Sequence, residues 1–492
     1  MPRIRRLLIA NRGEIAVRVI RACRDVGIAP LAVYAPPDAG APHVRLADDA
    51  LPLPAEAPAG GYLDIPSLIA AARHADADAL HPGYGFLAEN PALAAACESA
   101  RITFVGPPAE VLERCGDKAA SRAAAAAAGV PILPGTGAIA DAEAPRLAQA
   151  IGYPLLIKAA AGGGGKGIHL VRSPEDLQRA LPLARGEARS AFGDDRVYLE
   201  RWIDGPRHVE VQILAGAGGQ TIHLGERSCS VQRRHQKLIE EAPAPGLSPG
   251  LRRALGEAAV AVARALGYRN AGTIEFLVDG EAFFFMEVNA RIQVEHPVTE
   301  MITGVDLVAA QLAIAQGDAP PIAQDDLRQI GVAIECRISA EDPHAGFLPR
   351  TGVIDGVREP SGPGVRVDSG LWVGQVISRH FDPLLAKVIT WAPARETAIA
   401  RMRRALGEYA ISGVDTTIPF HLWALDHPEF VAGRYDVRFA DAWRQGPASD
   451  RGTRLAKLAA AAWAYRALET SALPLDGAAP AWVAAAREEG LR

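Results

Sequence analysis

Short apolar runs alternate with helical segments over the first hundred residues. Residues 7–10 and 31–34 are apolar runs typical of buried strands, and residues 15–26 between them carry apolar side chains at the helical spacing. A second helical segment at 65–74 and a strand at 79–80 repeat this order. Because parallel strands need crossover connections, which are usually helices, the sequence predicts a parallel sheet covered by helices.

Two further regions have different patterns. Pro131 and Pro134, with Gly135, mark the boundary of a unit from residue 132 to about 203, which we expect to be a small separate domain. Downstream, alternating runs predict a largely antiparallel sheet. The strands of the small unit are predicted at 155–159, 168–171 and 197–199, those of the antiparallel sheet at 209–214, 221–224, 273–278 and 282–288, and helices at 117–128, 249–266 and 454–468.

The charge and the apolar content narrow the classes of protein. With 492 residues and a net charge of -5, the chain has no basic excess to neutralise a nucleic-acid backbone, so we expect no nucleic-acid partner. Its apolar tracts, such as residues 123–128, are far shorter than the ~20 residues of a membrane span. Five scattered cysteines without a CxxC pair indicate a reducing compartment, and we expect the cytoplasm. We expect core or neutral roles for these residues, which are Cys23, Cys97, Cys115, Cys229 and Cys336.

Lysine is rare in this sequence. Of the 52 basic residues only six are lysine, so arginine is the generic cation and each lysine that is present suggests a specific role. The lysines stand at positions 118, 158, 166, 237, 387 and 457.

Four consecutive glycines join two predicted strands. Residues 162–165 lie between Lys158 and Lys166, and their bare amides can approach an anion closely. The loop is not a Walker A motif, because Gly167 stands where a Ser or Thr would bind magnesium. A flexible surface linker is the alternative, but the two lysines favour phosphate binding.

Glu275 and Glu287 stand on successive strands of a predicted hairpin. A two-residue turn would place them on opposite faces, whereas a three-residue loop at 279–281 pairs Glu275 with Phe285. That register makes the two carboxylates diagonal neighbours, roughly 7 to 8 Å apart, and Asn289 continues the same face. Such a set could bind magnesium together with nucleotide phosphates, and a solvated polar face is the alternative. The register places on the apolar face Ile274, Phe276, Phe284, Met286 and Val288.

Two polar clusters surround this hairpin in the sequence. If residues 289–297 are extended, Arg291, Gln293 and Glu295 project to one side, where the arginine could fix an oxyanion and the glutamate could act as a base. An ordinary surface ion pair is the alternative. The run at 226–237 is either a solvated basic turn or a set of donors for ribose and phosphate, among them Gln232, His235 and Lys237.

The ordered motifs of the chain resemble those of biotin carboxylase, the ATP-grasp component of biotin-dependent carboxylases. The resemblance covers about residues 3–440, and residues 364–420 look more like the biotin carboxylase portion of acyl-CoA carboxylase alpha chains or pyruvate carboxylase. The segments that carry it are 9–16, 81–86, 116–118, 157–167, 232–237, 241–245 and 291–306.

The resemblance implies an α/β (α+β) chain with an ATP-grasp fold. Its parts would be an N-terminal Rossmann-like domain at 1–115, an ATP-grasp domain at 116–335 that includes a mobile lid at 132–203, and a C-terminal biotin carboxylase domain at 336–445. Residues 446–492 would be a helical extension of unknown role.

The resemblance also implies roles for individual residues. Lys237, Arg291, Glu295 and Arg337 would be catalytic, with Arg337 facing biotin. Bicarbonate would be held by Lys237, Arg291, Gln293, Val294 and Glu295, and the metal by Glu275, Glu287 and Asn289. ATP would be bound by Lys118, Lys158, Gly163, Gly164, Gly165, Lys166, Glu200, Arg201, Ile203, His208, Gln232, His235, Glu275 and Glu287.

The implied reaction uses ATP, Mg²⁺ or Mn²⁺, and bicarbonate. Glu295 deprotonates bicarbonate, which attacks the γ-phosphate of ATP to give carboxyphosphate, and biotin is carboxylated after its decay to CO2 and phosphate. The chain lacks an Ala-Met-Lys-Met biotinylation motif, so biotin would be attached to another protein. The implied partners are a biotin carboxyl carrier protein, carboxyltransferase subunits and a second copy of the chain, with Arg18 and Arg21 near the dimer contact. The alternatives are another ATP-grasp ligase and a catalytically silent nucleotide-binding subunit of a carboxylase complex.

Overall fold

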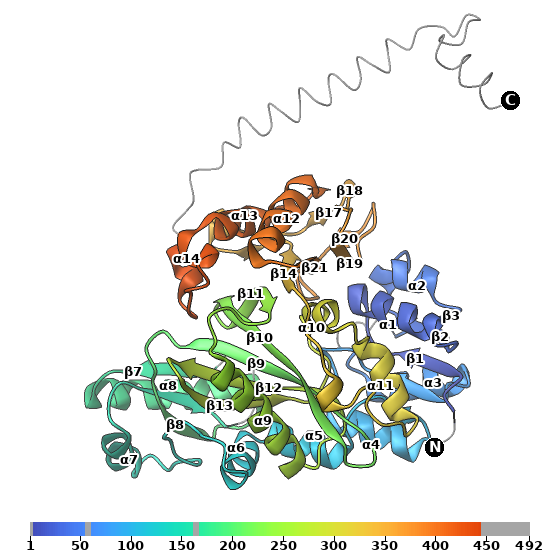
Figure 1. The fold of residues 1–492 in the computed structure, drawn as a ribbon. Helices are drawn as coiled ribbons and strands as arrows, with labels where there is room; N and C mark the ends of the chain where they lie inside the picture. Colours follow the sequence, from blue (N-terminus) through green and yellow to red (C-terminus); the bar gives the residue numbers. More distant parts are fainter. Residues whose placement is uncertain (1–2, 55–60, 161–166, 444–492) are drawn as a thin grey trace, which may run out of the picture. The chain divides into compact units, whose positions relative to one another are not determined.

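The computed structural model describes residues 3–54, 61–160 and 167–443 (Figure 1). Gly163, Gly164, Gly165 and Lys166 of the predicted phosphate loop, and the helix predicted at 454–468, lie outside these residues. Within them, no single helix has the length and hydropathy of a membrane span, and only the bent pair His296–Thr303 and Leu307–Ala315 passes that test together.

The N-terminal part contains a five-stranded sheet in the order β3-β2-β1-β4-β5, and its strands are parallel, as the sequence predicts. Leu7 and Ile9 of β1 pack with helix α1 on one side, and Leu8 packs with α3 on the other, so both faces are covered. The elements are β1 (Arg6–Ile9), α1 (Gly13–Asp25), β2 (Ala29–Tyr34), α2 (Pro42–Leu46), β3 (Asp49–Pro52), α3 (Ile65–His74), β4 (Ala79–His81), α4 (Pro91–Ser99), β5 (Thr103–Phe104) and α5 (Ala109–Gly116).

A second, three-stranded sheet in the order β7-β6-β8 stands apart from the other sheets. Its strands confirm the three predicted between residues 155 and 199, and Leu155, Ile157 and Leu199 form a core with the helices beside them. The elements are α7 (Ala144–Ile151), β6 (Leu155–Ala159), β7 (Ile168–Val171), α8 (Pro174–Phe192) and β8 (Val197–Arg201), and α6 (Lys118–Ala127) precedes them.

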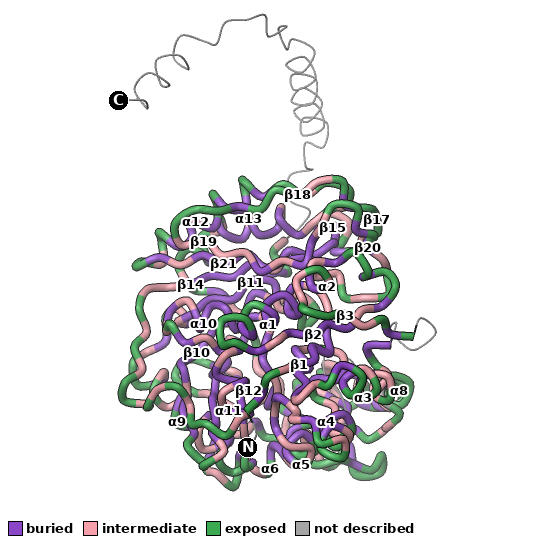
Figure 2. Tube along the Cα trace, turned by 90° about the vertical axis from the view of Figure 1, so that its right-hand side faces the viewer, coloured by how far each residue is buried: buried purple, intermediate pink, exposed green. Residues whose placement is uncertain are grey.

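The largest sheet has eight antiparallel strands in the order β13-β12-β9-β10-β11-β14-β21-β19. Figure 2 shows that buried residues follow its strands through the interior. The boundary predicted between residues 335 and 336 falls inside β14, so one continuous sheet joins the two predicted domains. Its strands are β9 (Arg207–Ala215), β10 (Thr221–Arg233), β11 (Gln236–Ala242), β12 (Asn270–Asp279), β13 (Ala282–Asn289), β14 (Val332–Ser339), β19 (Val365–Ser369) and β21 (Leu384–Ala392).

Helices cover both ends of this sheet. Ser248 caps α9 by accepting a hydrogen bond from the Leu251 amide at 3.1 Å, and α9 packs on β9 and β10. The helix α12 packs on β14 and β21. The helices are α9 (Pro249–Ala265), α10 (His296–Thr303), α11 (Leu307–Ala315), α12 (Arg395–Glu408), α13 (Ile418–Asp426) and α14 (Pro428–Val431).

Three small strand pairs complete the C-terminal part. They are β15 (Glu341–Asp342) with β16 (Leu348–Pro349), β17 (Gly352–Val353) with β20 (Val376–Ile377), and β18 (Gly356–Arg358) with β22 (Ala410–Ser412).

The register of the β12–β13 hairpin differs from the prediction. The turn has two residues, because Asp279 pairs with Ala282, and the register shifts between Phe276 and Glu275. Met286 is the extra residue of this β-bulge, so Glu287 lies directly opposite Glu275. The predicted diagonal arrangement is therefore wrong, although both carboxylates do share a face. The bulge also changes the apolar face, which contains Phe285 in place of Phe284 and Met286: its members are Ile274, Phe276, Val278, Phe285 and Val288.

Candidate active site

A row of charged side chains crosses four strands of the large sheet. Arg227 on β10 lies opposite Glu210 on β9, which lies opposite Glu275 on β12, which in turn lies opposite Glu287 on β13. Residues directly opposite each other in a sheet project from the same face, so this row faces one side. Three adjacent carboxylates repel one another unless cations neutralise them.

Lys237 on β11 provides the central cation. Its ammonium donates to Glu210, Glu275 and Glu295 at 2.5, 2.8 and 2.6 Å, and to the Gln293 side chain at 3.1 Å. Burial opposes the positive charge, but the surrounding acidic groups hold the pKa of Lys237 well above its usual value. Lys237 therefore stays charged and links Glu210 and Glu275 on the sheet to Gln293 and Glu295 on the segment before α10.

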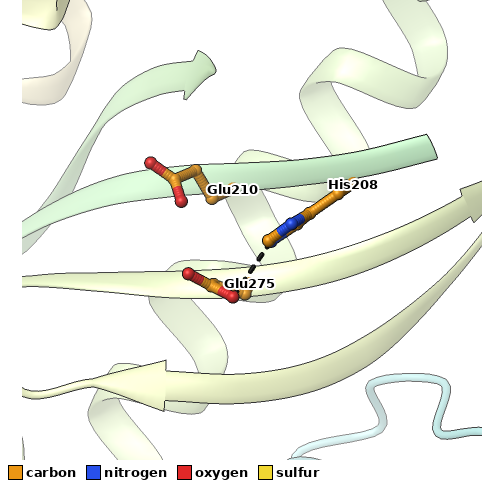
Figure 3. A group of neighbouring side chains, drawn as sticks. All are labelled: His208, Glu210 and Glu275. Carbon is orange, nitrogen blue, oxygen red and sulfur yellow. Dashed lines mark ion pairs between the residues drawn. The ribbon is translucent and has the colours of Figure 1, made fainter. Parts of the chain in front are cut away.

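The polar row continues along β9. His208 and Glu210 alternate with Val209 and Val211, which are buried in the core on the opposite face. Figure 3 shows His208, Glu210 and Glu275 on the same side, with the ion pair between His208 Nε2 and Glu275 at 2.9 Å. Burial alone would raise the pKa of Glu275, but Lys237 and His208 lower it well below its usual value. Both oxygens of Glu275 thus have protein partners, Lys237 at one and His208 at the other.

Glu287 has fewer partners than Glu275. The only cation paired with it among the described residues is Lys118, at 3.8 Å, and its pKa is raised by burial and by the charge of Glu275. The Oδ1 of buried Asn289 accepts from Arg291 at 3.1 Å and is the atom of this side chain that could ligate a metal. Carboxylate and amide oxygens suit a hard divalent cation, so Glu275, Glu287 and Asn289 fit the predicted Mg²⁺ or Mn²⁺ site.

Glu295 is wholly buried between two cations. One oxygen accepts from Lys237, and the other accepts from Arg337 Nη2 at 2.8 Å. Burial would raise the pKa of Glu295, but Lys237, Arg337 and Arg227 lower it. Arg337 also donates through Nε to Glu240 at 2.6 Å, so its guanidinium bridges two buried carboxylates.

The segment that carries Glu295 is not the extended row that the sequence predicts. The chain leaves β13 at Asn289, bends and turns over residues 290–295, and enters α10 at His296, so that Pro297 lies in the first turn of the helix. Gln293 and Glu295 both meet Lys237, as expected. Arg291 instead turns toward Glu89, at 3.0 Å, and toward the Asn289 side chain at 3.1 Å. No neighbouring strand holds this segment extended, so the regular row is absent, but Arg291 stays close enough to Glu295 and Glu275 for their charges, with that of Glu89, to raise its pKa against the effect of burial.

The predicted nucleotide-binding residues that remain lie at the small sheet and at the β10–β11 hairpin, apart from Lys118, which begins α6. Lys158 on β6 pairs with Glu200 on β8, and Arg122 pairs with the other oxygen of Glu200 at 2.5 Å. Arg201 follows Glu200, and its backbone amide donates to the Pro134 carbonyl at 2.8 Å. The half-buried Ile203 lies just after β8.

The hairpin turn between β10 and β11 places His235 beside positive charges. Gln232 lies one residue before the end of β10, opposite Lys237, and Arg234 and His235 form the two-residue turn with φ of 48° and 66°. Burial lowers the pKa of His235, and Lys158, His208 and Lys118 lower it further. These residues gather within electrostatic reach of one another although they are distant in sequence, and their excess of positive charge suits a polyanion such as nucleotide phosphate.

Several charged residues at the site were not predicted. Arg227 is wholly buried and donates to Gln212 at 2.8 Å, Thr299 at 2.9 Å and Thr273 at 3.2 Å, besides Glu210. The alternation of polar and apolar residues on β9 could have revealed Glu210, whereas nothing in the sequence marks Glu89. The five cysteines are all buried, as expected, and Cys229 Sγ lies 3.9 Å from Glu295.

Comparisons with known families match three consecutive parts of the chain. Residues 3–112 match the biotin carboxylase N-terminal domain, residues 117–322 match the ATP-binding domain of the carbamoyl-phosphate synthase L chain, and residues 335–442 match the biotin carboxylase C-terminal domain.

Individual relatives are similar over most of their length. The chain is 49% identical to biotin carboxylase 1 of Bacillus subtilis, over 89% of this chain and 99% of that protein. It is also 51% identical to the biotin carboxylase of a Nostoc species, over 88% of this chain and 98% of that protein.

A solved structure has the same fold. It is the biotin carboxylase domain dimer of 2-oxoglutarate carboxylase from Hydrogenobacter thermophilus, in complex with MgADP, ADP and bicarbonate. The TM-score is 0.87 at 46% identity, over 90% of this chain and 98% of that chain. These similarities confirm the predicted fold class.

Proposed function

The chain belongs to the biotin carboxylase family, and on that premise we propose that it uses ATP and bicarbonate to carboxylate biotin held by a separate carrier protein. The observation that carries the proposal is the position of Glu295, buried between Lys237 and Arg337. The Glu295 carboxylate thus contacts both Lys237, a cation suited to bicarbonate, and Arg337, a cation suited to the ureido oxygen of biotin.

Bicarbonate would bind at Lys237, Arg291, Gln293, Val294 and Glu295. Lys237 already holds Glu295 and Gln293 together, so an oxyanion that bonds to its ammonium also lies next to Glu295. The low pKa of Glu295 makes it a poor base while both cations contact it. When bicarbonate takes over part of the Lys237 interaction, Glu295 loses stabilisation of its charged form and becomes a stronger base.

Deprotonated bicarbonate would then attack the γ-phosphorus of ATP, which releases ADP and gives carboxyphosphate. Carboxyphosphate breaks down to CO2 and phosphate, and the phosphate removes the N1 proton of biotin. Arg337 would stabilise the negative charge that develops on the ureido oxygen, because its guanidinium is fixed by Glu240 and Glu295. The biotin nitrogen then attacks CO2.

Nucleotide phosphates would meet Lys118, Lys158 and His235, with Glu200, Arg201, Ile203, His208 and Gln232 around the nucleotide. Glu275, Glu287 and Asn289 would hold Mg²⁺ or Mn²⁺, which when bound neutralises charge on the phosphates. The unit at 132–203, with its own small sheet and core, would act as the lid that excludes water from the site.

The expected partners are a biotin carboxyl carrier protein, carboxyltransferase subunits and a second copy of the chain, in the cytoplasm. A cavity of about 440 Å³ next to Arg18 and Arg21 lies where the dimer contact is expected. Arg18 is itself buried and paired with Glu300 at 2.8 Å and Asp306 at 2.7 Å.

ADP release by the purified chain, measured with magnesium and bicarbonate and with or without free biotin, tests the proposal. We expect ATP cleavage that depends on bicarbonate and rises with biotin. Cleavage that biotin does not stimulate would favour another ATP-grasp ligase, and no cleavage at all would favour a silent subunit.

A further inference from the structure

Lys387 is a rare lysine that has no place in the proposed nucleotide or bicarbonate set. It lies on β21, directly opposite Arg337 on β14 and Asp368 on β19, so the three side chains share one face of the large sheet. Its side chain is wholly buried. A buried lysine is costly unless partners satisfy its charge and its three donors.

The partners of Lys387 come from three separate parts of the chain. Its ammonium donates to the Val294 carbonyl at 2.8 Å and lies 3.2 Å from Glu14 on α1 and 3.7 Å from Asp368. Burial alone would lower the pKa of Lys387, but Glu14, Glu335 and Asp368 raise it above its usual value. The charge is therefore retained, and Tyr84 donates to the same oxygen of Glu14.

His296 holds the neighbouring peptide group. Its Nδ1 lies 2.7 Å from the Gln293 carbonyl, and the ring is wholly buried. Burial and the nearby cations hold the pKa of His296 well below its usual value, so the ring is neutral. Because a carbonyl only accepts, the Nδ1 of the neutral ring carries the proton.

Together these contacts fix the two peptide groups on either side of Val294. The Gln293 carbonyl belongs to the peptide that contains the Val294 N–H, and the Val294 carbonyl belongs to the peptide that leads into Glu295. This segment lies between β13 and α10, where no strand ladder supplies hydrogen bonds. Besides a long backbone bond from the His296 amide to the Gln293 carbonyl at 3.3 Å, the side chains of Lys387 and His296 satisfy and orient its carbonyls.

We propose that Lys387 and His296 are positioning residues for bicarbonate, which hold the Gln293–Glu295 backbone so that the Val294 amide and the Glu295 carboxylate face the substrate. The proposal rests on the proposed function for the identity of the substrate. The Lys387–Glu14 pair further ties this orientation to helix α1 of the N-terminal part.

The test compares variants that remove each anchor. Lys387→Met is combined with Glu14→Gln, so that no unpaired carboxylate remains at that position, while Asp368 keeps its pair with Arg366. His296→Phe removes the second anchor without any change of charge and provides an independent variant. Lys387→Arg keeps the cation. Arg395→Met is the matched control, since Arg395 also joins a buried carboxylate, Glu241, and donates to backbone carbonyls but contacts none of the site residues.

The readouts are the KM values for bicarbonate and for MgATP in bicarbonate-dependent ATP cleavage, and hydrogen–deuterium exchange of residues 290–298. We expect the double variant and His296→Phe each to raise the KM for bicarbonate about tenfold, as for the loss of one strong hydrogen bond, with the KM for MgATP changed by less than about twofold. Exchange in 290–298 should become faster, Lys387→Arg should recover part of the bicarbonate KM, and Arg395→Met should change neither readout.

Equal effects on both KM values, or unchanged exchange in 290–298, would overturn the proposal. Failure of the proposed function is distinguishable, because the unmodified chain itself would then lack bicarbonate-dependent cleavage. The exchange measurement still tests the backbone anchors in that case.

Discussion

Glu275 and Glu287 lie directly opposite each other across the β12–β13 hairpin, yet Lys237 and His208 engage both oxygens of the first, whereas among the described residues Lys118 alone pairs with the second. The two carboxylates share one face, but protein groups neutralise Glu287 less than Glu275. A bound metal cation would therefore stabilise the charge of Glu287 more than that of Glu275. The register depends on the bulge at Met286, so a backbone irregularity creates the site.

Substitution of Glu287 should therefore affect the metal more than the fold. We expect Glu287→Gln to raise the Mg²⁺ concentration for half-maximal ATP cleavage by about tenfold or more, because a neutral amide replaces a carboxylate ligand. The thermal stability of the metal-free protein should not fall, since the change removes repulsion with Glu275. A magnesium titration of the rate and a melting curve check both points, and an unchanged magnesium requirement would contradict the assignment.

Lys158 and Arg122 both pair with Glu200. A substitution of Lys158 therefore leaves Glu200 with a cation, and its effect on nucleotide binding can be measured apart from its effect on stability. Lys158→Met should raise the KM for ATP about tenfold or more through loss of a phosphate contact. The melting temperature should change little, because Arg122 still pairs with Glu200. Lys158→Arg is the control that keeps the charge. A large loss of stability with an unchanged KM would show that Lys158 is structural instead.

Arg227 should be essential for the fold. Its removal leaves the wholly buried Glu210 with Lys237 alone and leaves Gln212, Thr273 and Thr299 without their donor. We expect Arg227→Met to lower the free energy of unfolding by about 3–5 kcal/mol, the usual cost of breaking a buried ion pair. Urea unfolding checks this value. A loss below about 1 kcal/mol, typical of an exposed pair, would contradict it.

Glu240 should make stability depend on pH. Burial is the main reason that its pKa rises to about 7, although Arg337 opposes the rise and Glu295 adds to it. Its ordinary pKa in the unfolded chain is about 4.3, so the folded chain holds the extra proton between these values. The stability that this group contributes therefore falls as pH rises from about 4.3 to about 7 and then stays constant.

Glu240→Gln removes this dependence. The free energy of unfolding of the variant, relative to the parent, should increase between about pH 5 and about pH 8, as measured by urea unfolding at several pH values. If the difference in free energy of unfolding between variant and parent is the same at about pH 5 and about pH 8, Glu240 does not hold a proton in the folded chain.

The sequence predicted the elements well where one periodicity dominates. The parallel sheet around β1, helix α3 and the strands of the small unit were all predicted, because their apolar residues repeat at the spacing of a strand or a helix. The hairpin register was wrong, since alternation assumes one residue per position and the bulge at Met286 inserts another. The segment at 291–295 is not extended because no neighbouring strand holds it and it turns before the helix that begins at His296, although Pro297 in the first turn of that helix is a known signal of a helix start.

The candidate site was predictable only in part. Lys237, Gln293 and Glu295 meet as expected. The contact of Arg291 with Glu89 joins residues about two hundred positions apart and has no local signal. Lys387 was marked by the scarcity of lysine, but its partners on α1 and beside α10 depend on tertiary structure alone.

The most direct test of the central claim is the transfer of label from ¹⁴C-bicarbonate to biotin by the purified chain, beside a Glu295→Gln variant. We predict acid-labile label on biotin that requires both ATP and magnesium, and a rate at least about a hundredfold lower in the variant, the usual contribution of a general base. ATP cleavage without label on biotin, or equal labelling by parent and variant, would contradict the account.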